Sequence, residues 1–104
     1  MKLNSSVFGG SRAMDIQQLA LWVIDVDRRL IALKAFSNER VLHPSDIAKE
    51  SGRSIQNISR ALREMEGKEI VKCIGEKNTW RKYLLTKKGK KVLDEVRKIL
   101  EYDA

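Results

Sequence analysis

Residues 44–67 read PSDIAKESGRSIQNISRALREMEG, and this segment carries the most specific fold signal in the chain. It predicts a short helix over 44–51, because proline suits the first turn of a helix. Gly52 breaks the pattern, and Ser54 can cap a second helix over 55–66. Small and apolar side chains occupy the positions where two helices would cross closely, namely Ile47, Ala48, Ile58 and Leu62. Two helices that meet at a tight glycine turn form a helix-turn-helix unit.

The segment before this unit predicts a helix from Asp15 to about Phe36. Asp15 can act as its N-cap, with Gln18 at the capping-box position. Apolar residues form two stripes on different faces of this helix. The first stripe consists of Ile16, Leu19, Val23, Val26, Leu30 and Leu33. The second stripe consists of Ile24, Ile31 and Ala35. The second stripe favours contact with another subunit. Two alternatives remain open: the domain wraps this helix more fully, or the helix breaks in two near Asp25.

The segment after the unit predicts a two-stranded hairpin and a last helix. Segments 69–74 and 80–85 are rich in β-branched, aromatic and aliphatic residues, and 75–79 has the composition of a loop between them. Thr86 can cap a final helix that runs to about Tyr102. The predicted fold is therefore α+β, mainly helical with a small β-hairpin: a winged helix-turn-helix with a long N-terminal helix and a C-terminal helix.

The charge of the chain is concentrated in one segment. The 104 residues suit one compact domain, which we assign to 13–104, and 1–12 lack periodicity and are expected to form a flexible N-terminal arm. The formal net charge is +7, but segment 51–91 carries twelve lysines and arginines against four glutamates, a net charge of +8, and the remainder carries −1. A polyanion, either nucleic acid or an anionic membrane, is therefore the favoured partner.

Several kinds of chemistry have no support in the residue types present. The single Cys73 excludes an intrachain disulfide and a thiolate metal cluster, and the single His43 excludes a multi-histidine metal site. We predict a small buried thiol at Cys73, a turn or packing role for His43, no metal and no cofactor. The sequence has no glycine-rich phosphate loop and no nucleophile beside a histidine, so the protein is predicted not to be an enzyme.

A membrane location has no support either. The longest apolar run, 19–24, is far shorter than the roughly 20 residues that a membrane span needs. The N-terminus lacks the apolar stretch and the cleavage site of a signal peptide. We therefore expect a cytoplasmic protein without a membrane partner.

The second helix of the unit has one apolar face and one cationic face. If Ile58 points inward, a rotation of about 100° per residue places Ile55, Leu62 and Met65 inward as well. Glutamine and arginine fall on the opposite face, and their paired donors and acceptors match the edges of adenine and guanine in the major groove. The N–H groups at the helix start can hold a phosphate. The candidate DNA-binding residues on this helix are Ser54, Gln56, Asn57, Ser59, Arg60 and Arg63.

A second group of cations follows in the hairpin and at the start of the last helix. Cations at a helix N-terminus oppose the helix dipole, so their clustering there indicates an external anion. Phosphates and the adjacent minor groove suit these side chains. We expect Trp80 and Tyr83 to pack rather than to stack on bases. The candidate DNA-binding residues in this group are Lys77, Asn78, Arg81, Lys82, Lys87 and Lys88.

The sequence resembles the winged-helix transcription regulators of the MarR type over about residues 27–98. The strings PSDIAKESG at 44–52, ISRALREME at 58–66 and YLLTKKG at 83–89 carry the resemblance. It implies a homodimer joined through the N- and C-terminal helices, with one helix of each subunit in a major groove and the hairpin beside it. The related ArsR-type repressors use clusters of cysteine and histidine that this sequence lacks. The candidate dimer-interface residues are Leu21, Trp22, Ile24, Ile31, Ile99 and Leu100.

The leading hypothesis is a sequence-specific binder of double-stranded DNA. In this hypothesis the protein is a homodimeric transcriptional regulator that acts at the nucleoid, and a repressor rather than an activator. The sequence identifies no small-molecule effector. Two alternatives remain, because a fold alone does not fix a function. One is an architectural DNA-binding protein without sequence preference, and the other is a winged-helix module that binds RNA or protein.

Overall fold

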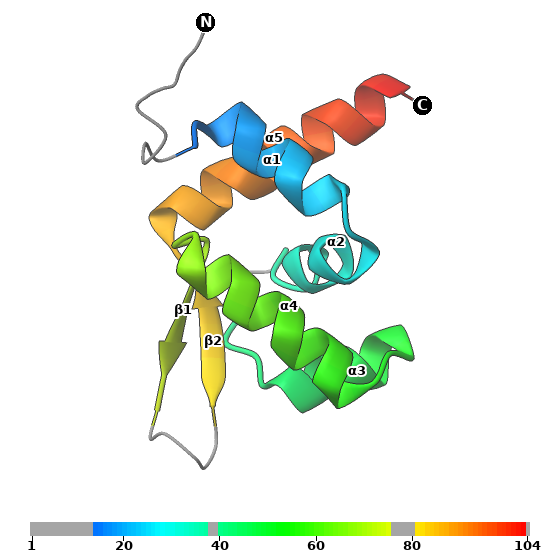
Figure 1. Ribbon diagram of the computed structural model, residues 1–104, viewed down its shortest axis with the longest axis vertical. Coiled ribbons are helices and arrows are strands. Elements are labelled where there is room, and N and C mark those ends of the chain that lie inside the picture. The colour runs from blue at the N-terminus through cyan, green and yellow to red at the C-terminus, as the bar shows by residue number, and fades with distance from the viewer. Residues whose placement is uncertain (1–13, 38–39, 76–80, 104) are drawn as a thin grey trace, which may run out of the picture.

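The structure is a computed structural model that describes residues 14–37, 40–75 and 81–103. Within these residues the elements follow in the order α1 (Ile16–Ile24), α2 (Asp27–Lys34), α3 (Pro44–Ser51), α4 (Ile55–Gly67), β1 (Val71–Ile74), β2 (Lys82–Leu85) and α5 (Lys87–Asp103). Helices α1 and α5 lie together at one end, and α3, α4 and the hairpin form the other end (Figure 1). The predicted class, mainly helical with a small hairpin, is confirmed. The expected arm, 1–12, lies outside the described residues.

Local hydrogen bonds begin the helices where the sequence predicts. The Gln18 N–H donates to Asp15 Oδ1 at 2.8 Å, and the Asp15 N–H donates to Gln18 Oε1 at 3.0 Å, which completes the predicted capping box of α1. Ser54 Oγ accepts from the Asn57 N–H at 3.1 Å and caps α4. Gly52 ends α3 with a φ of 76°, a left-handed conformation that favours glycine. The turn between α3 and α4 is therefore specified by short-range interactions.

The prediction of one helix from Asp15 to about Phe36 is wrong, and the alternative break near Asp25 is what the structure has. Val26 is extended, with φ −128° and ψ 120°, between α1 and α2. Its N–H bonds to the Val23 carbonyl at 3.3 Å. The Trp22 carbonyl, which a continuous helix would pair with that N–H, accepts instead from Arg29 Nη1 at 3.0 Å. A side chain thus replaces the missing helical hydrogen bond at this corner.

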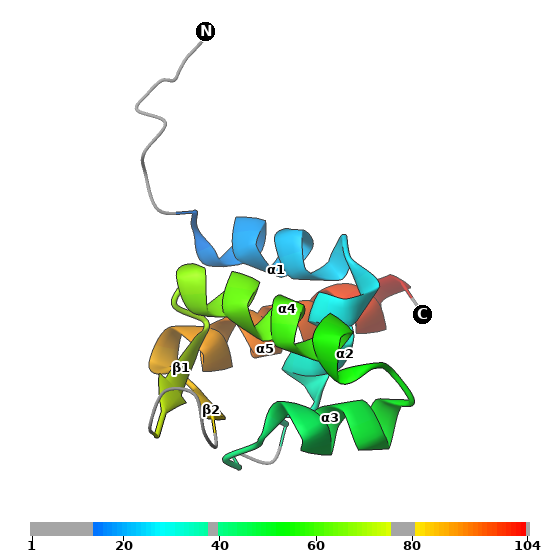
Figure 2. The same cartoon turned by 60° about the horizontal axis from the view of Figure 1, so that its bottom comes forward.

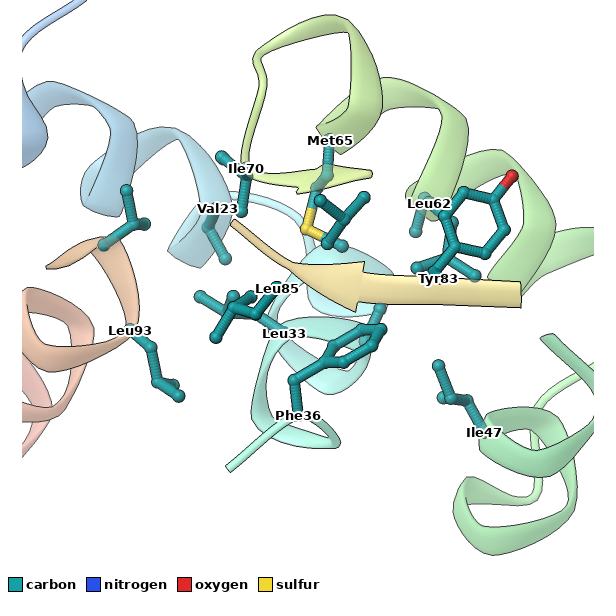
Figure 3. Packing of buried hydrophobic residues seen from close by; sticks show 14 of the residues in the cluster. Val23, Leu33, Phe36, Ile47, Leu62, Met65, Ile70, Tyr83, Leu85 and Leu93 are labelled. Carbon is teal, nitrogen blue, oxygen red and sulfur yellow. The ribbon is translucent and has the colours of Figure 1, made fainter. Parts of the chain in front are cut away.

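The core lies between the helices and the hairpin, and every element contributes to it (Figure 3). Helix α4 crosses the middle of the molecule with α3 below it and the hairpin to one side (Figure 2). It buries a single stripe, Ile58, Ala61, Leu62 and Met65. Tyr83 is also fully buried, which confirms its predicted packing role. Cys73 is half-buried rather than fully buried.

The prediction that the Ile55 side chain points into the core is wrong. Its side chain is 53% exposed, although Ile58 is fully buried. The two residues lie about 60° apart around the helix, so Ile55 stands at the edge of the buried stripe. Because Ile55 is the first residue of α4, no preceding turn covers it.

The hairpin is an antiparallel pair in which Val71 lies opposite Leu85. Leu42, which lies between α2 and α3, joins the other edge of β2. Its N–H donates to the Tyr83 carbonyl at 2.9 Å, and the Tyr83 N–H donates to the Leu42 carbonyl at 2.8 Å. These bonds fix the hairpin to the segment that precedes α3.

The start of α5 is held tightly against the segment between α4 and β1. Thr86 Oγ1 accepts from the Gly89 N–H at 2.8 Å and donates to the Glu69 carbonyl at 2.7 Å. The predicted cap at Thr86 is confirmed. A Cβ on Gly89 would overlap the Ile70 carbonyl oxygen and lie 2.9 Å from Leu85 Cδ1. Glycine is therefore required here by close backbone approach.

We predict that Gly89→Ala lowers the free energy of unfolding by about 1–3 kcal/mol, because the added methyl group forces the backbone apart. Gly67→Ala is the matched control, since a Cβ there meets nothing within 4 Å. A helical Gly→Ala change should leave stability unchanged or raise it by up to about 1 kcal/mol. Chemical denaturation followed by circular dichroism measures both. Equal effects of the two substitutions would contradict the close approach.

Candidate nucleic-acid interface

We define the outer face of α4 as Ile55, Gln56, Ser59, Arg60 and Arg63, whose side chains line one shallow hollow of about 650 Å³. Residues spaced by four lie along one side of a helix. The opposite side of α4 packs against α2, α3 and β1, which fixes the direction of the outer face. The structure therefore brings together four of the six candidates on this helix: Gln56, Ser59, Arg60 and Arg63.

The long polar side chains of the outer face are accessible. Arg60 is 71% exposed, and its Nε lies 3.8 Å from Glu64 Oε2. An exposed ion pair of this length contributes little to stability and does not hold the guanidinium in place. Gln56 and Arg63 are exposed as well. The outer face thus offers one amide and two guanidinium groups, which can form paired hydrogen bonds to a planar polar edge.

The remaining two candidates on this helix have other surroundings. Ser54 caps α4 through the Asn57 N–H. Asn57 precedes Glu64 by seven residues, so it lies on the side of α4 that faces α2 rather than on the outer face. Its amide oxygen is shielded from solvent and has no hydrogen-bond partner among the described residues. The structure does not bring Asn57 to the hollow.

Glu64 joins α4 to α2 through two ion pairs. Its Oε2 accepts from Arg28 Nη2 at 2.8 Å, and its Oε1 accepts from Arg29 Nε at 3.0 Å. The three side chains are between 14% and 25% exposed. The Arg29 guanidinium also lies 3.9 Å from the centre of the Trp22 ring. Glu64 therefore connects the helix that carries the outer face to the corner between α1 and α2.

The environment of Glu64 changes its acidity. Partial burial raises the pKa of this carboxyl, but hydrogen bonds and charges from Arg28 and Arg29 outweigh burial, so the pKa lies below its usual value of 4.5. The sequence predicts no role for these three residues. The arginines precede Glu64 by 36 and 35 positions, so no local pattern indicates the pairing.

The hairpin of β1 and β2, which is the wing of this fold, holds part of the second candidate group. Arg81 is exposed, and its Nη1 donates to the Tyr83 hydroxyl at 3.1 Å. Burial raises the pKa of Tyr83, so the hydroxyl that receives this bond stays neutral near pH 7. Lys82 is half-buried. Lys77, Asn78 and Trp80 lie outside the described residues.

The start of α5 supplies the other cations. Lys87 is exposed. Lys88 is half-buried, and its Nζ lies 3.5 Å from Glu69 Oε1. Lys87 is therefore more accessible to an external anion than Lys88.

The candidate dimer residues lie on the layer formed by α1, α2 and α5. Helix α1 packs along α5 within the same chain (Figure 1). Leu21 on α1 is 53% exposed. The other candidates are half-buried and pack against the core of their own chain: Trp22, Ile24, Ile31, Ile99 and Leu100. Leu21 is thus the most exposed member of the set.

Other chemistry is sparse in the described part of the chain. The His43 backbone N–H donates to Asp46 Oδ2 at 2.9 Å, which lowers the pKa of Asp46 and confirms a turn role for His43. No group of three or more histidines, cysteines or carboxylates within 14–37, 40–75 and 81–103 is arranged to hold a metal ion. None of the described helices has the length and apolarity to cross a membrane.

Several solved structures have a fold similar to that of this chain. A TubR mutant of type III plasmid segregation matches with a TM-score of 0.72 and 15% identity, over 86% of this chain and 97% of that one. A MarR-family transcriptional regulator from Silicibacter pomeroyi matches with a TM-score of 0.63 and 20% identity, over 81% of this chain and 59% of that one. The chain has the winged-helix fold of MarR-type regulators.

A third winged-helix match is MepR, a transcription regulator of the Staphylococcus aureus multidrug efflux pump MepA. It has a TM-score of 0.66 and 22% identity, over 84% of this chain and 69% of that one. A mutant of MepR is also known in complex with an oligodeoxyribonucleotide. No family model matches the sequence, and no curated protein matches it either.

We predict that Glu64→Gln lowers the free energy of unfolding by about 1–2 kcal/mol at pH 7, because Arg28 and Arg29 lose their charged partner. A lowered pKa contributes stability that is complete above the ordinary glutamate pKa of 4.5 and is lost as pH falls through the lowered value. The difference between the two proteins should therefore shrink below about pH 4.5. Denaturation curves from pH 7 to pH 3 measure it.

Asp94→Asn is the control for this experiment. Asp94 is 70% exposed and lies 3.8 Å from Arg97, so its loss should cost less than about 0.5 kcal/mol at any pH. A cost for Glu64→Gln that is as small as the control, or that does not change with pH, would contradict a stabilising role for the Glu64 ion pairs.

Proposed function

We propose that the protein binds double-stranded DNA in a sequence-specific manner, with the outer face of α4 in the major groove. The observation that carries the proposal is the grouping of Gln56, Arg60 and Arg63 on one exposed face of the second helix of a helix-turn-helix. Arginine pairs bidentately with guanine and glutamine with adenine, and the major groove is wide enough to admit a helix.

Exposed cations outside α4 support a nucleic-acid ligand. Arg81 in the wing and Lys87 at the start of α5 are exposed and are suited to phosphate oxygens. Contacts to phosphates fix the position of a protein on the duplex without reading its sequence. The MepR mutant bound to an oligodeoxyribonucleotide, which shares this fold, supports DNA as the ligand class.

The proposed regulator is a homodimer, and α1 and α5 form its subunit interface. Leu21 supports this arrangement, because a large apolar side chain that is 53% exposed gains free energy when a second copy covers it. A dimer presents two recognition helices to half-sites about 34 Å apart. Repression is favoured over activation, because a protein that occupies a promoter blocks access without any further contact. Such a protein acts at the nucleoid in the cytoplasm.

Arg60→Ala should reduce the preference for a selected duplex over random duplex by about 1–3 kcal/mol, because one base contact is lost. The selected duplex comes from a random library retained by the protein at about 0.15 M salt with competitor DNA. Lys87→Ala is the matched control, since it removes one exposed cation that touches only phosphate in this proposal. It should weaken all duplexes alike and lower the salt dependence by about one released ion.

Fluorescence anisotropy titrations of both duplexes measure these effects. If Arg60→Ala weakens selected and random duplex equally, α4 does not read bases. If the library yields no enriched sequence, the protein binds DNA as an architectural component, and if single-stranded RNA competes better than duplex, the ligand is RNA.

Leu21→Glu should convert the dimer into a monomer with an unchanged circular dichroism spectrum, because it places a charge in an apolar interface. Val41→Glu is the control, since Val41 is 46% exposed and lies outside the terminal helices. Sedimentation equilibrium of the three proteins gives their masses. A wild-type protein that is monomeric at micromolar concentration would rule out this interface.

A further inference from the structure

Ile55 stands out on the outer face of α4. It is the one apolar residue of the five that line the hollow, and its side chain is 53% exposed. Its neighbours Gln56 and Arg60 are exposed polar side chains, and Ser59 lies one turn further along the same side. An apolar side chain is thus embedded in the surface that is proposed to read DNA.

The folded chain does not require isoleucine at this position. Ser54 supplies the cap that starts α4, and the buried stripe begins at Ile58. A β-branched residue is a weaker helix former than alanine or glutamate, and an exposed side chain gains little free energy from burial. A single exposed apolar residue is common in proteins. The feature that needs an explanation is the position of Ile55. It lies at the start of α4, among the hydrogen-bonding groups of the outer face.

We propose that Ile55 is a specificity-determining residue that packs against the 5-methyl group of a thymine in the major groove. This proposal rests on the proposed DNA-binding function. The thymine methyl is the apolar group that the base pairs present in the major groove, and apolar side chains recognise it by contact. Isoleucine suits the task, because its branched Cβ restricts the side chain to few rotamers before binding.

Helix geometry places the thymine relative to the other contacts. Four residues rise about 6 Å along a helix, and successive base pairs lie about 3.4 Å apart. Ile55 and Ser59 therefore face positions about two base pairs apart. We expect the thymine within about two base pairs of the base that Arg60 contacts, and a dimer would have one such thymine in each half-site.

Replacement of thymine by deoxyuridine tests this contact, because it removes the methyl group and keeps the base pairing. In the duplex selected from the random library, each thymine is replaced singly, and the Kd is measured for the wild type, for Ile55→Ala and for Val41→Ala. Val41 is a matched control, since it is 46% exposed and precedes α3 rather than belonging to α4. Each of these side chains is exposed, so truncation should preserve the fold, and circular dichroism checks this.

One position in each half-site should show an increase of about fourfold in the wild-type Kd, the equivalent of roughly 0.8 kcal/mol for one buried methyl-sized group. The Val41→Ala protein should show the same increase. The Ile55→Ala protein should bind the duplex with thymine and the duplex with deoxyuridine at that position equally well. A double-mutant cycle gives the coupling free energy between the Ile55 side chain and the methyl group.

The contact is overturned if no single replacement changes the wild-type Kd, or if Ile55→Ala keeps the full sensitivity. In both cases the selected duplex is still bound with preference, so the proposed function stands. If the library yields no selected duplex, sequence-specific binding itself is wrong, and the role of Ile55 falls with it.

Discussion

Helix α4 buries one stripe of side chains, and the arrangement of the other elements depends on that packing. Ile58, Leu62 and Met65 are fully buried against α2, α3 and the hairpin. Since a helix surface repeats every 3.6 residues, the burial of this stripe leaves the opposite side to solvent. The direction of Gln56 and Arg60 is therefore a consequence of core packing. A domain that holds one side of a helix this firmly presents the other side as a rigid surface, which lowers the entropic cost of binding.

The Glu64 ion pairs extend this constraint to the terminal helices. Arg29 takes part in three interactions: with Glu64, with the Trp22 carbonyl and with the Trp22 ring. The same arginine side chain therefore stabilises the break between α1 and α2 and holds α4 through Glu64. Ion pairs that are largely shielded from solvent are screened weakly by salt, so this connection between the helices persists at physiological ionic strength.

The sequence predicts most of the fold because the decisive signals are local. The caps at Asp15 and Thr86 each involve a side chain and a backbone N–H three residues later, so the amino-acid sequence alone indicates them. The break at Val26 is different, because the apolar stripe continues through it and the stabilising partner is a side chain. In the candidate site, helical periodicity places Gln56 and Arg60 outward. Periodicity fails for Ile55, because it carries no information on where a neighbouring element stops covering a helix.

In the proposed function, the outer face of α4 is the surface that contacts duplex DNA. Titration of the isotope-labelled protein with a random-sequence duplex at low salt, followed by amide chemical shifts, tests it most directly. Shifts should concentrate at residues 55–63 and at 81–88, while α1 and the second half of α5 stay unchanged. Shifts confined to α1 and α5, or no shifts at a duplex concentration that saturates binding, would contradict it.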